Sequence, residues 1–286
     1  MKRLKYVKTV MIVIAVFLFM LFFSGSADKE NRDTRSFEKK LVAFWNFSEE
    51  AGQSRISKKG MRQFALLEGN GEISRVAEGL QDGYSARIED GKWFYIPRDS
   101  LYELNIYGEN AQVTVIAWVK KYSDKDWQAV GGVWDETRSK RQYYLFLNAS
   151  KKVHQDEMKR YPSKDLVHGH ISSIGGVTPG EKACITYASS KDPVPVNQWA
   201  MIAMTYDSEF IKVYIDGRLS NDEKTNPFRY DTGIFNGGDN GADFTIGANS
   251  VRNTMTNQFI GLIDGLAVFN KALSEDEIFK ICKYGI

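Results

Sequence analysis

The segment 194–219 constrains the fold more than any other part of this 286-residue chain. Residues 199–206 are apolar at both alternating positions, which is typical of a central β-strand that is covered on both faces. After a polar break at 207–209, residues 210–215 alternate between aliphatic and more polar positions. Asp216-Gly217 follows, and Asp-Gly favours a tight turn because both residues tolerate positive φ. The segment therefore predicts two antiparallel strands and a turn in the middle of a β-sandwich.

Further short apolar segments extend this pattern along the chain. They lie at 41–47, 64–67, 85–88, 93–96, 113–120, 127–133, 143–147, 243–248 and 258–269, and turn-forming residues separate them. Strands at this spacing predict a sandwich or barrel rather than alternating strands and helices. Residues 148–193 and 220–242 lack a clear period, so we expect two long loops there, and loops of this length are usually functional or disordered.

The first 27 residues predict an export signal. Four basic residues precede the uninterrupted apolar run 10–23, and a small-residue cleavage site ends at Ala27. The run is shorter than the about 20 residues that usually span a bilayer, and an uncleaved signal-anchor helix is the alternative to cleavage. Either way we expect an extracytoplasmic protein, secreted or anchored, that contacts a membrane only through this segment. Residues 28–40 then form a polar tether, and 41–286 form the β domain.

Charge and cysteine content exclude two classes of protein. The formal net charge is +2, and four of the basic residues belong to the predicted signal, so no basic face for nucleic acid is predicted. Two cysteines, Cys184 and Cys282, are too few for a disulfide-rich scaffold. They either pair in an oxidising compartment or remain two buried free thiols.

The chain is predicted to end in a short helix. Ser274 and Glu277 have the spacing of a capping box, in which each side chain hydrogen-bonds the other residue's backbone N–H. Ile278, Ile281 and Cys282 would then face the sandwich.

Four segments, in this order, resemble the laminin-G-like jelly rolls of the concanavalin A-like lectin/glucanase superfamily. They are FWNFSEEAG, VTVIAWVK, the hairpin VPVNQWAMIAMTYDSEFIKVYIDGRL, and FIGLIDGLAVFNKALSEDEI, and together they extend over most of residues 41–283. The resemblance implies an all-β jelly roll of two stacked antiparallel sheets with a concave face. Members of the superfamily include carbohydrate-binding modules, adhesion modules, glycoside hydrolases and polysaccharide lyases, so the fold follows more directly than the function.

Asp264 is an acid among the aliphatic residues at 260, 262, 266 and 268, which share its strand parity. A buried carboxylate is unfavourable unless it is paired or bound to a metal. The resemblance implies a structural calcium ion held by Asp264 together with backbone oxygens near Asn46, Phe47 and Gly83. The alternative is that Asp264 caps a bend or pairs with a basic residue.

Sugar binding requires aromatic faces for stacking and polar groups that orient hydroxyls. We expect the ligand site at the rim of the sandwich, where segments 148–193 and 220–242 meet it. His168 and His170 would point the same way on a strand, as metal ligands often do, but their spacing matches no zinc signature and a solvated loop is the alternative. The predicted ligand-binding residues are Trp127, Trp134, Tyr161, His168, His170, Phe228, Tyr230, Asp231, Asn236 and Asp239.

No catalytic pattern is present in the sequence. Glycosidases place two carboxylates across the cleaved bond, and hydrolases of the superfamily usually carry them as Glu-x-Asp-x-Glu on one strand, a pattern that no predicted strand has. The Arg- and His-based motifs of the lyases are absent as well. We therefore predict an exported carbohydrate-binding or adhesion module without catalysis, with a glycan or an extracellular protein as partner. The alternative is a glycoside hydrolase or lyase with displaced acids such as Asp135 or Glu136.

Overall fold

The computed structural model describes residues 37–148 and 166–286. The chain divides into two units, Met1–Lys39 and Lys40–Ile286, and the second unit contains both sheets. The predicted signal, nearly all of the predicted tether, and Tyr161 lie outside the described residues. Across the two described ranges, no helix is both long and apolar enough to cross a membrane.

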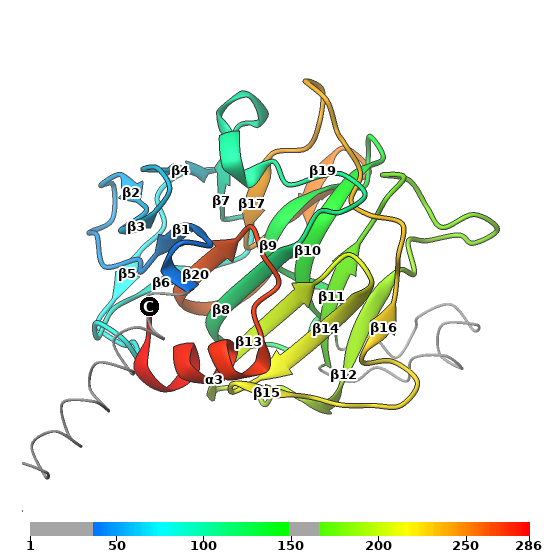
Figure 1. The fold of residues 1–286 in the computed structure, drawn as a ribbon. Coiled ribbons are helices and arrows are strands. Elements are labelled where there is room, and N and C mark those ends of the chain that lie inside the picture. Colours follow the sequence, from blue (N-terminus) through cyan, green and yellow to red (C-terminus); the bar gives the residue numbers. More distant parts are fainter. Residues whose placement is uncertain (1–36, 149–165) are drawn as a thin grey trace, which may run out of the picture. The chain divides into compact units, whose positions relative to one another are not determined.

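The first sheet contains the predicted hairpin of residues 199–215. Its strands are β1 (Leu41–Trp45), β3 (Lys59–Gly60), β5 (Arg75–Val76), β6 (Ser85–Ile88), β8 (Val113–Lys121), β13 (Trp199–Tyr206), β14 (Phe210–Ile215), β15 (Arg218–Leu219), β16 (Phe228–Arg229) and β20 (Gly261–Phe269). Their order is β15-β14-β13-β8-β20-β1-β3, with β16 beside β14, β6 beside β20, and β5 beside β6 (Figure 1). The predicted bounds of the two hairpin strands are confirmed.

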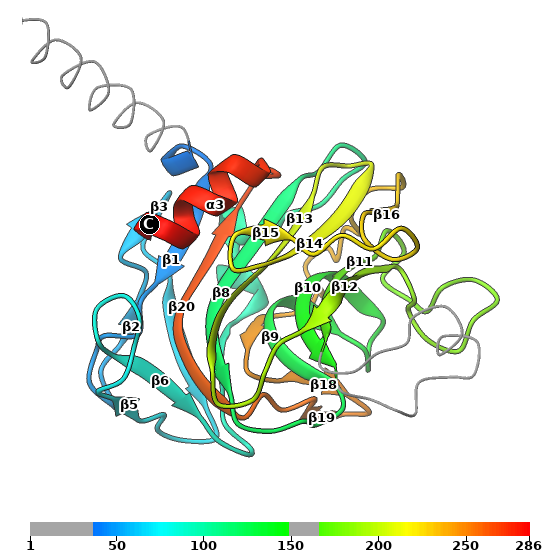
Figure 2. The ribbon, with the colours of Figure 1, turned by 90° about the horizontal axis from the view of Figure 1, so that it is seen from below.

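The second sheet stacks against the first, and Figure 2 shows the two layers from below. Its strands are β2 (Arg55–Ile56), β4 (Ala65–Gly69), β7 (Trp93–Ile96), β9 (Gln128–Asp135), β10 (Lys140–Asn148), β11 (Leu166–Ile171), β12 (Tyr187–Pro193), β17 (Phe244–Ile246), β18 (Asn249–Val251) and β19 (Thr254–Thr256). Their order is β12-β11-β10-β9-β17-β7-β4-β2, with β18 beside β9 and β19 beside β18. The predicted two-sheet antiparallel sandwich is confirmed.

The turn after β14 forms as the sequence predicts. Asp216 and Gly217 both have positive φ, 48° and 79°, and the Asp216 carboxylate accepts a hydrogen bond from the Met201 N–H. A Cβ atom on Gly217 would lie 2.9 Å from the Cys282 side chain, so this position requires glycine for space as well as for φ.

The prediction of one long loop at 148–193 was wrong, because this range contains β11 and β12. The sequence of β11, LVHGHI, has only a short apolar period, because Gly169 occupies the inner position between Val167 and Ile171. Its two histidines face away from the core, where a strand with an exposed face would normally carry polar residues. In the second predicted loop, 220–242, only the two-residue strand β16 forms among regular elements.

The C-terminal helix α3 (Glu275–Tyr284) begins at the predicted capping box, with Ser274 and Glu277 hydrogen-bonded reciprocally. Ile278 and Ile281 are buried, Cys282 is half-buried, and both Cys184 and Cys282 are free thiols. Two short 3-10 helices, η1 (Arg98–Ser100) and η2 (Tyr102–Leu104), connect β7 to β8.

Candidate functional site

The outward face of β10, β11 and β12 carries an unusual set of side chains. Val167 and Ile171 of β11 belong to the core between the sheets, so the alternating His168 and His170 face outward. Gly169 lies between them on the inner side, where a Cβ atom would come within 2.8 Å of the Met204 side chain. Glycine thus lets β11 pack closely on the opposite sheet while both histidines point away from it.

The two histidines lie among aromatic rings that come from four segments. His170 stacks on Tyr187 of β12 with ring centroids 4.4 Å apart, and Phe146 of β10 lies 5.1 Å from it. The Trp127 ring lies edge-on to both histidines, 5.4 Å from His168 and 5.6 Å from His170. We call this set the histidine cage, and its members are His168, His170, Trp127, Trp134, Phe146 and Tyr187.

The polar atoms of the cage histidines are buried without partners. His168 is 0% exposed and His170 is 4% exposed, and within the described ranges none of their four ring nitrogens has a hydrogen-bond partner. Burial lowers the pKa of His168 to about 3. Burial, and then the charges of His168 and Arg141, lower the pKa of His170 well below its usual value. Both rings are therefore neutral at physiological pH, each with one donor and one acceptor, and each unpartnered group costs about 1–3 kcal/mol.

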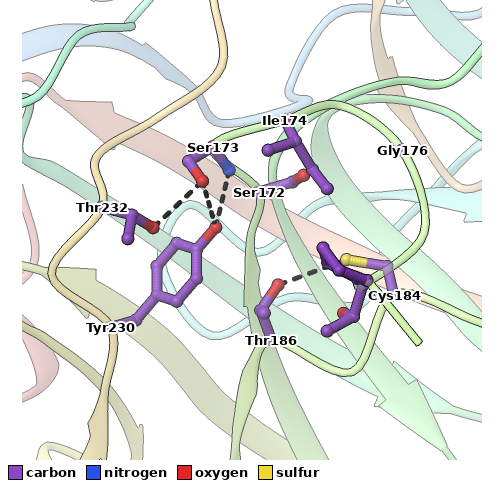
Figure 3. Close-up of a pocket in the computed structure, with 10 residues that line it drawn as sticks. Ser172, Ser173, Ile174, Gly176, Cys184, Thr186, Tyr230 and Thr232 are labelled. Atoms are coloured by element: carbon purple, nitrogen blue, oxygen red, sulfur yellow. Dashed lines mark hydrogen bonds between the residues drawn. The ribbon is translucent and has the colours of Figure 1, made fainter. Parts of the chain in front are cut away.

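A cavity of about 250 Å³ opens at one end of this face, where residues 172–186 meet residues 230–232 (Figure 3). We call it the hydroxyl cavity because six of its ten lining residues carry a hydroxyl group and none of its lining side chains is charged, although most of the surface that lines it is apolar. The lining residues are Ser172, Ser173, Ile174, Gly176, Thr178, Pro179, Cys184, Thr186, Tyr230 and Thr232.

A network of hydroxyl groups positions one wall of the hydroxyl cavity. The Tyr230 hydroxyl accepts a hydrogen bond from the Ser173 N–H at 2.7 Å and donates to Ser173 Oγ at 2.8 Å. Thr232 Oγ1 also donates to Ser173 Oγ, at 3.0 Å (Figure 3). Ser173 Oγ therefore accepts two hydrogen bonds and keeps its own hydrogen, while Thr232 Oγ1 keeps its acceptor lone pairs. The wall is fixed in place, yet it offers one donor and one acceptor to a ligand.

The hydroxyl cavity and the histidine cage are neighbours. Ser172, which lines the cavity, follows His170 by two residues and extends the same side of β11. Cys184 lines the cavity and also packs against the aromatic cluster that contains Trp134 and Phe146. Burial raises the pKa of the Cys184 thiol, so it is a neutral, weakly polar wall group.

The structure distributes the predicted ligand-binding residues over several places. Trp127, Trp134, His168 and His170 meet in the histidine cage, and Tyr230 lines the hydroxyl cavity. Trp134 follows the predicted strand 127–133 directly, and in the structure it lies within β9 and is 2% exposed.

The other described ligand-binding candidates belong to neither set, although Phe228 lies next to the cage. Phe228 packs on the cluster of Ile185 and Tyr187. Asp231 is exposed and pairs with Arg229 at 3.1 Å. Asn236 and Asp239 lie on the exposed turn 236–241, where Asn236 accepts a hydrogen bond from the Gly238 N–H.

Sequence reasoning missed most of the cavity lining, including Ser172, Ser173, Thr186 and Thr232. The available signal was the alternation His168–His170–Ser172 in the sequence HGHISS, which is a two-residue period of polar side chains. That period places Ser172 beside the predicted histidines. Thr232 is different, because only the tertiary structure brings it from 60 residues further along the chain.

A second candidate site surrounds Asp264, and the predicted geometry there was partly wrong. The register between β20 and β8 shifts between Ile263 and Gly265, so Asp264 is the extra residue of a β-bulge. Ile263 before the bulge, and Leu266 after it, both belong to the core. Residues 260–268 therefore do not share one alternating face, because the bulge changes the phase of the alternation.

The Asp264 carboxylate caps the turn at residues 80–81, as one of the predicted alternatives requires. Its Oδ2 accepts hydrogen bonds from the Leu80 and Gln81 N–H groups at 2.6 and 2.9 Å, while its Oδ1 is buried without a partner in the described ranges. Burial raises the pKa of Asp264, and the nearby Asp82 charge raises it further. The Asn46 side chain in turn donates to Asp82.

This oxygen set fits calcium, because hard cations favour carboxylate and carbonyl oxygens and Asp264 Oδ1 lacks any other partner. Phe47 follows Asn46 and has φ 50°, so the backbone changes direction there, and Gly83 follows Asp82 with φ 76°. The Phe47 side chain itself is buried against Phe94, so that only its backbone could serve as a ligand. Across residues 37–148 and 166–286, no group of three or more His, Cys, Asp or Glu side chains could hold a metal ion, so a calcium ion at Asp264 would depend on backbone carbonyl oxygens for most of its ligands.

The displaced acids named as alternative catalytic groups are both close to arginines. Asp135 Oδ2 lies 2.5 Å from Arg138 Nε, and Glu136 Oε2 lies 3.5 Å from Arg141 Nη2.

A laminin-G-type family model, described as the concanavalin A-like lectin/glucanases superfamily, matches residues 91–279. The chain belongs to this superfamily. The matched range contains the histidine cage, the hydroxyl cavity and Asp264, whereas Asn46, Phe47 and Gly83 precede it. No curated protein sequence matches the chain.

Solved structures from several organisms share the fold of the superfamily at low sequence identity. Domain 4 of AbnA, a GH43 extracellular arabinanase from Geobacillus stearothermophilus in complex with arabinotriose, has a TM-score of 0.56 at 17% identity, over 85% of this chain and 98% of that one. A structure of botulinum neurotoxin type C, whose cell entry depends on interaction with two ganglioside molecules, has a TM-score of 0.52 at 10% identity, over 88% of this chain and 53% of that one. Trypanosoma rangeli sialidase in complex with 2,3-difluorosialic acid has a TM-score of 0.52 at 14% identity, over 85% of this chain and 32% of that one.

Proposed function

We propose that this protein is a glycan-binding module without catalysis of its own, and that the hydroxyl cavity holds one uncharged sugar residue. The observation that carries the proposal is the lining of the cavity, which combines hydroxyl groups with the Tyr230 ring and contains no charged side chain. The volume of about 250 Å³ lies below the about 300–1,000 Å³ of pockets for drug-sized ligands, which favours a single ring over a long segment of chain.

The chemistry of the cavity wall suits a neutral sugar. The free hydrogen of Ser173 Oγ and the lone pairs of Thr232 Oγ1 are a donor and an acceptor close together, as neighbouring sugar hydroxyls require. Tyr230 adds a half-buried aromatic ring against which the C–H face of a sugar can pack. An anionic sugar would find no positively charged side chain in the lining.

The comparison with domain 4 of AbnA supports a module of this kind, because the two chains have nearly the same extent and that domain is in complex with arabinotriose. An extracellular protein surface is the other partner that the neighbours suggest, since a botulinum neurotoxin DC binding domain is in complex with rat synaptotagmin II. The hydroxyl cavity favours the glycan, because a protein partner would be expected to require a flatter apolar surface.

We further propose that the oxygen groups around Asp264 hold a structural calcium ion. Asp264 Oδ1 would be a ligand, with the backbone near Asn46, Phe47 and Gly83 supplying carbonyl oxygens. Such an ion would join the chain after β1 to the 80–83 turn and β20. Export of the protein, with or without cleavage after Ala27, is also a proposal, and it rests on the sequence of residues 1–27.

The proposal is tested by titrating the protein with neutral monosaccharides and oligosaccharides in a calorimeter, with charged sugars for comparison. Thr232→Val keeps the shape of the side chain and removes its hydroxyl, so it should weaken binding about fivefold, the equivalent of one hydrogen bond of about 1 kcal/mol. Thr256→Val, on the exposed strand β19, is the matched control and should bind like the wild type.

Two results would contradict the proposal. If no neutral sugar binds, or if Thr232→Val and Thr256→Val behave alike, the hydroxyl cavity is not the site. If reducing ends accumulate with any glycan, the protein is a catalyst and the non-catalytic part of the proposal is wrong.

A further inference from the structure

We infer that the histidine cage is a second sugar subsite, next to the hydroxyl cavity along β11, in which His168 and His170 recognise hydroxyl groups. This inference rests on the proposed function and extends it from one bound ring to an oligosaccharide. It names the ligand as a short neutral chain whose terminal residue occupies the hydroxyl cavity.

The unpartnered nitrogens carry the inference. His168 and His170 are 0% and 4% exposed, and within the described part of the chain their four ring nitrogens have no hydrogen-bond partner. Buried polar groups in proteins nearly always have partners, so four orphaned atoms in two adjacent rings indicate that a bound molecule completes them. Two neutral imidazoles offer two donors and two acceptors, which matches a pair of sugar hydroxyls.

The surroundings of the two histidines favour a sugar over a metal ion. The groups around them are the rings of Trp127, Phe146 and Tyr187, which supply flat apolar faces. In the described ranges no third His, Cys, Asp or Glu joins them to form a metal-binding group. Aromatic walls with a few fixed polar atoms are the usual composition of a sugar site.

Trp127 is the half-buried member of the cage, whereas the other five side chains are buried, so its rotation is the movement that would open a path to the nitrogens. Its ring lies edge-on to both His168 and His170, and it is only half-buried itself. Its φ is 52°, which is an uncommon conformation for a bulky residue. Trp127 precedes β9, so a rotation of its side chain leaves the sheet hydrogen bonds intact. Rotated outward, the indole would expose the two imidazoles and offer its own face to the sugar.

The position of the cage relative to the cavity sets the expected ligand length. Ser172 is the first residue after β11 and follows His170 by two positions, which corresponds to about 6.6 Å along an extended chain. This spacing suits adjacent residues of one oligosaccharide. A chain of two or more sugars should therefore bind more tightly than the monosaccharide, and the gain should come from the cage.

The test compares a monosaccharide with its oligosaccharides in the wild type and in the double variant His168→Gln/His170→Gln. The wild type should bind the oligosaccharide about tenfold to thirtyfold more tightly than the monosaccharide, as two added hydrogen bonds predict. The double variant should lose this gain and keep monosaccharide affinity. If the double variant keeps the gain, the cage is not a subsite. If the wild type binds no sugar at all, the proposed function itself fails.

A second measurement keeps the inference testable should the double variant not fold. The imidazole nitrogen signals of wild-type protein labelled with 15N-histidine are recorded by nuclear magnetic resonance during titration with the oligosaccharide, with the monosaccharide and with Zn²⁺. Two of the three histidines should shift with the oligosaccharide and not with the monosaccharide. A response to equimolar Zn²⁺ without a response to the oligosaccharide would identify a metal site and overturn the inference. No response to either ligand would also overturn it.

Discussion

His168→Phe should make the protein markedly more resistant to acid. His168 is fully buried, and burial lowers its pKa to about 3, so the folded protein keeps this ring neutral down to low pH. In the unfolded chain the same side chain titrates at about 6.5. Below that pH the unfolded state binds a proton that the folded state excludes, and protonation therefore favours unfolding. Phenylalanine keeps an aromatic ring in the cage and removes the titration.

The magnitude follows from the two pKa values. The folded pKa lies below the unfolded one, so the contribution of His168 to stability is fully present above about pH 6.5 and falls by about 1.36 kcal/mol per pH unit below it. Between about pH 7.5 and pH 5 the loss is about 2 kcal/mol, and it continues until the pH approaches 3. His170, whose pKa is lowered by burial and by the charges of His168 and Arg141, adds a loss of the same sign.

The assay is urea unfolding of the wild type and of His168→Phe, followed by tryptophan fluorescence, at a series of pH values from about 7.5 to 5. The difference in unfolding free energy between the two proteins should change by about 2 kcal/mol across this range, in favour of the variant. Two other effects largely cancel from this change in the free-energy difference. A packing difference between the two proteins is the same at both pH values, and the titration of other groups is the same in both proteins. Parallel stability profiles would show that His168 takes up a proton in the folded state, and the reasoning about the cage would be refuted.

Three further substitutions test other parts of the structure. Asp264→Asn should abolish the stabilisation of the protein by calcium, which for the wild type is about 2.7 kcal/mol at a calcium concentration a hundredfold above the Kd. Thermal melting with calcium and with EDTA measures this stabilisation. A variant that calcium still stabilises would show that the ion binds elsewhere. Ser274→Ala removes the cap of α3 and should lower the unfolding free energy by about 1 kcal/mol in urea, whereas an unchanged midpoint would mean that the cap does not contribute. Asn226→Ala removes the buried side chain that hydrogen-bonds the Val213 N–H and C=O groups, and it should lower the unfolding free energy by at least about 2 kcal/mol in the same assay. A decrease below about 1 kcal/mol would contradict this role of Asn226.

The sequence predicted those elements whose pattern is local. The bounds of β13 and β14, the turn at Asp216-Gly217 and the cap of α3 all follow from alternation or from fixed spacing within a few residues. Asp264 shows the limit of this reasoning. Its strand was predicted correctly, but a bulge at Asp264 shifts the alternation, and a bulge depends on how β20 pairs with β8.

Part of the candidate site was also accessible from the sequence. His168 and His170 have the spacing of two side chains on one face of a strand, and Tyr230 belongs to a segment that was expected to reach the rim. What was not predicted was the strand character of β11 and β12, because a glycine interrupts the apolar inner face of β11 and the exposed residues Lys191, Asp192 and Pro193 end β12.

The sequence alone determined that this chain folds as a β-sandwich with a capped C-terminal helix, because side-chain period and turn chemistry act over neighbouring residues. Only the tertiary structure decided which side chains form the two binding sets. The rings of the histidine cage come from separate segments of the chain. Strand pairing and the path of the chain before β9 bring into contact the rings of Trp127, Phe146, His170 and Tyr187. The burial that leaves the histidine nitrogens without partners arises from that assembly, since no single segment can remove a ring from water.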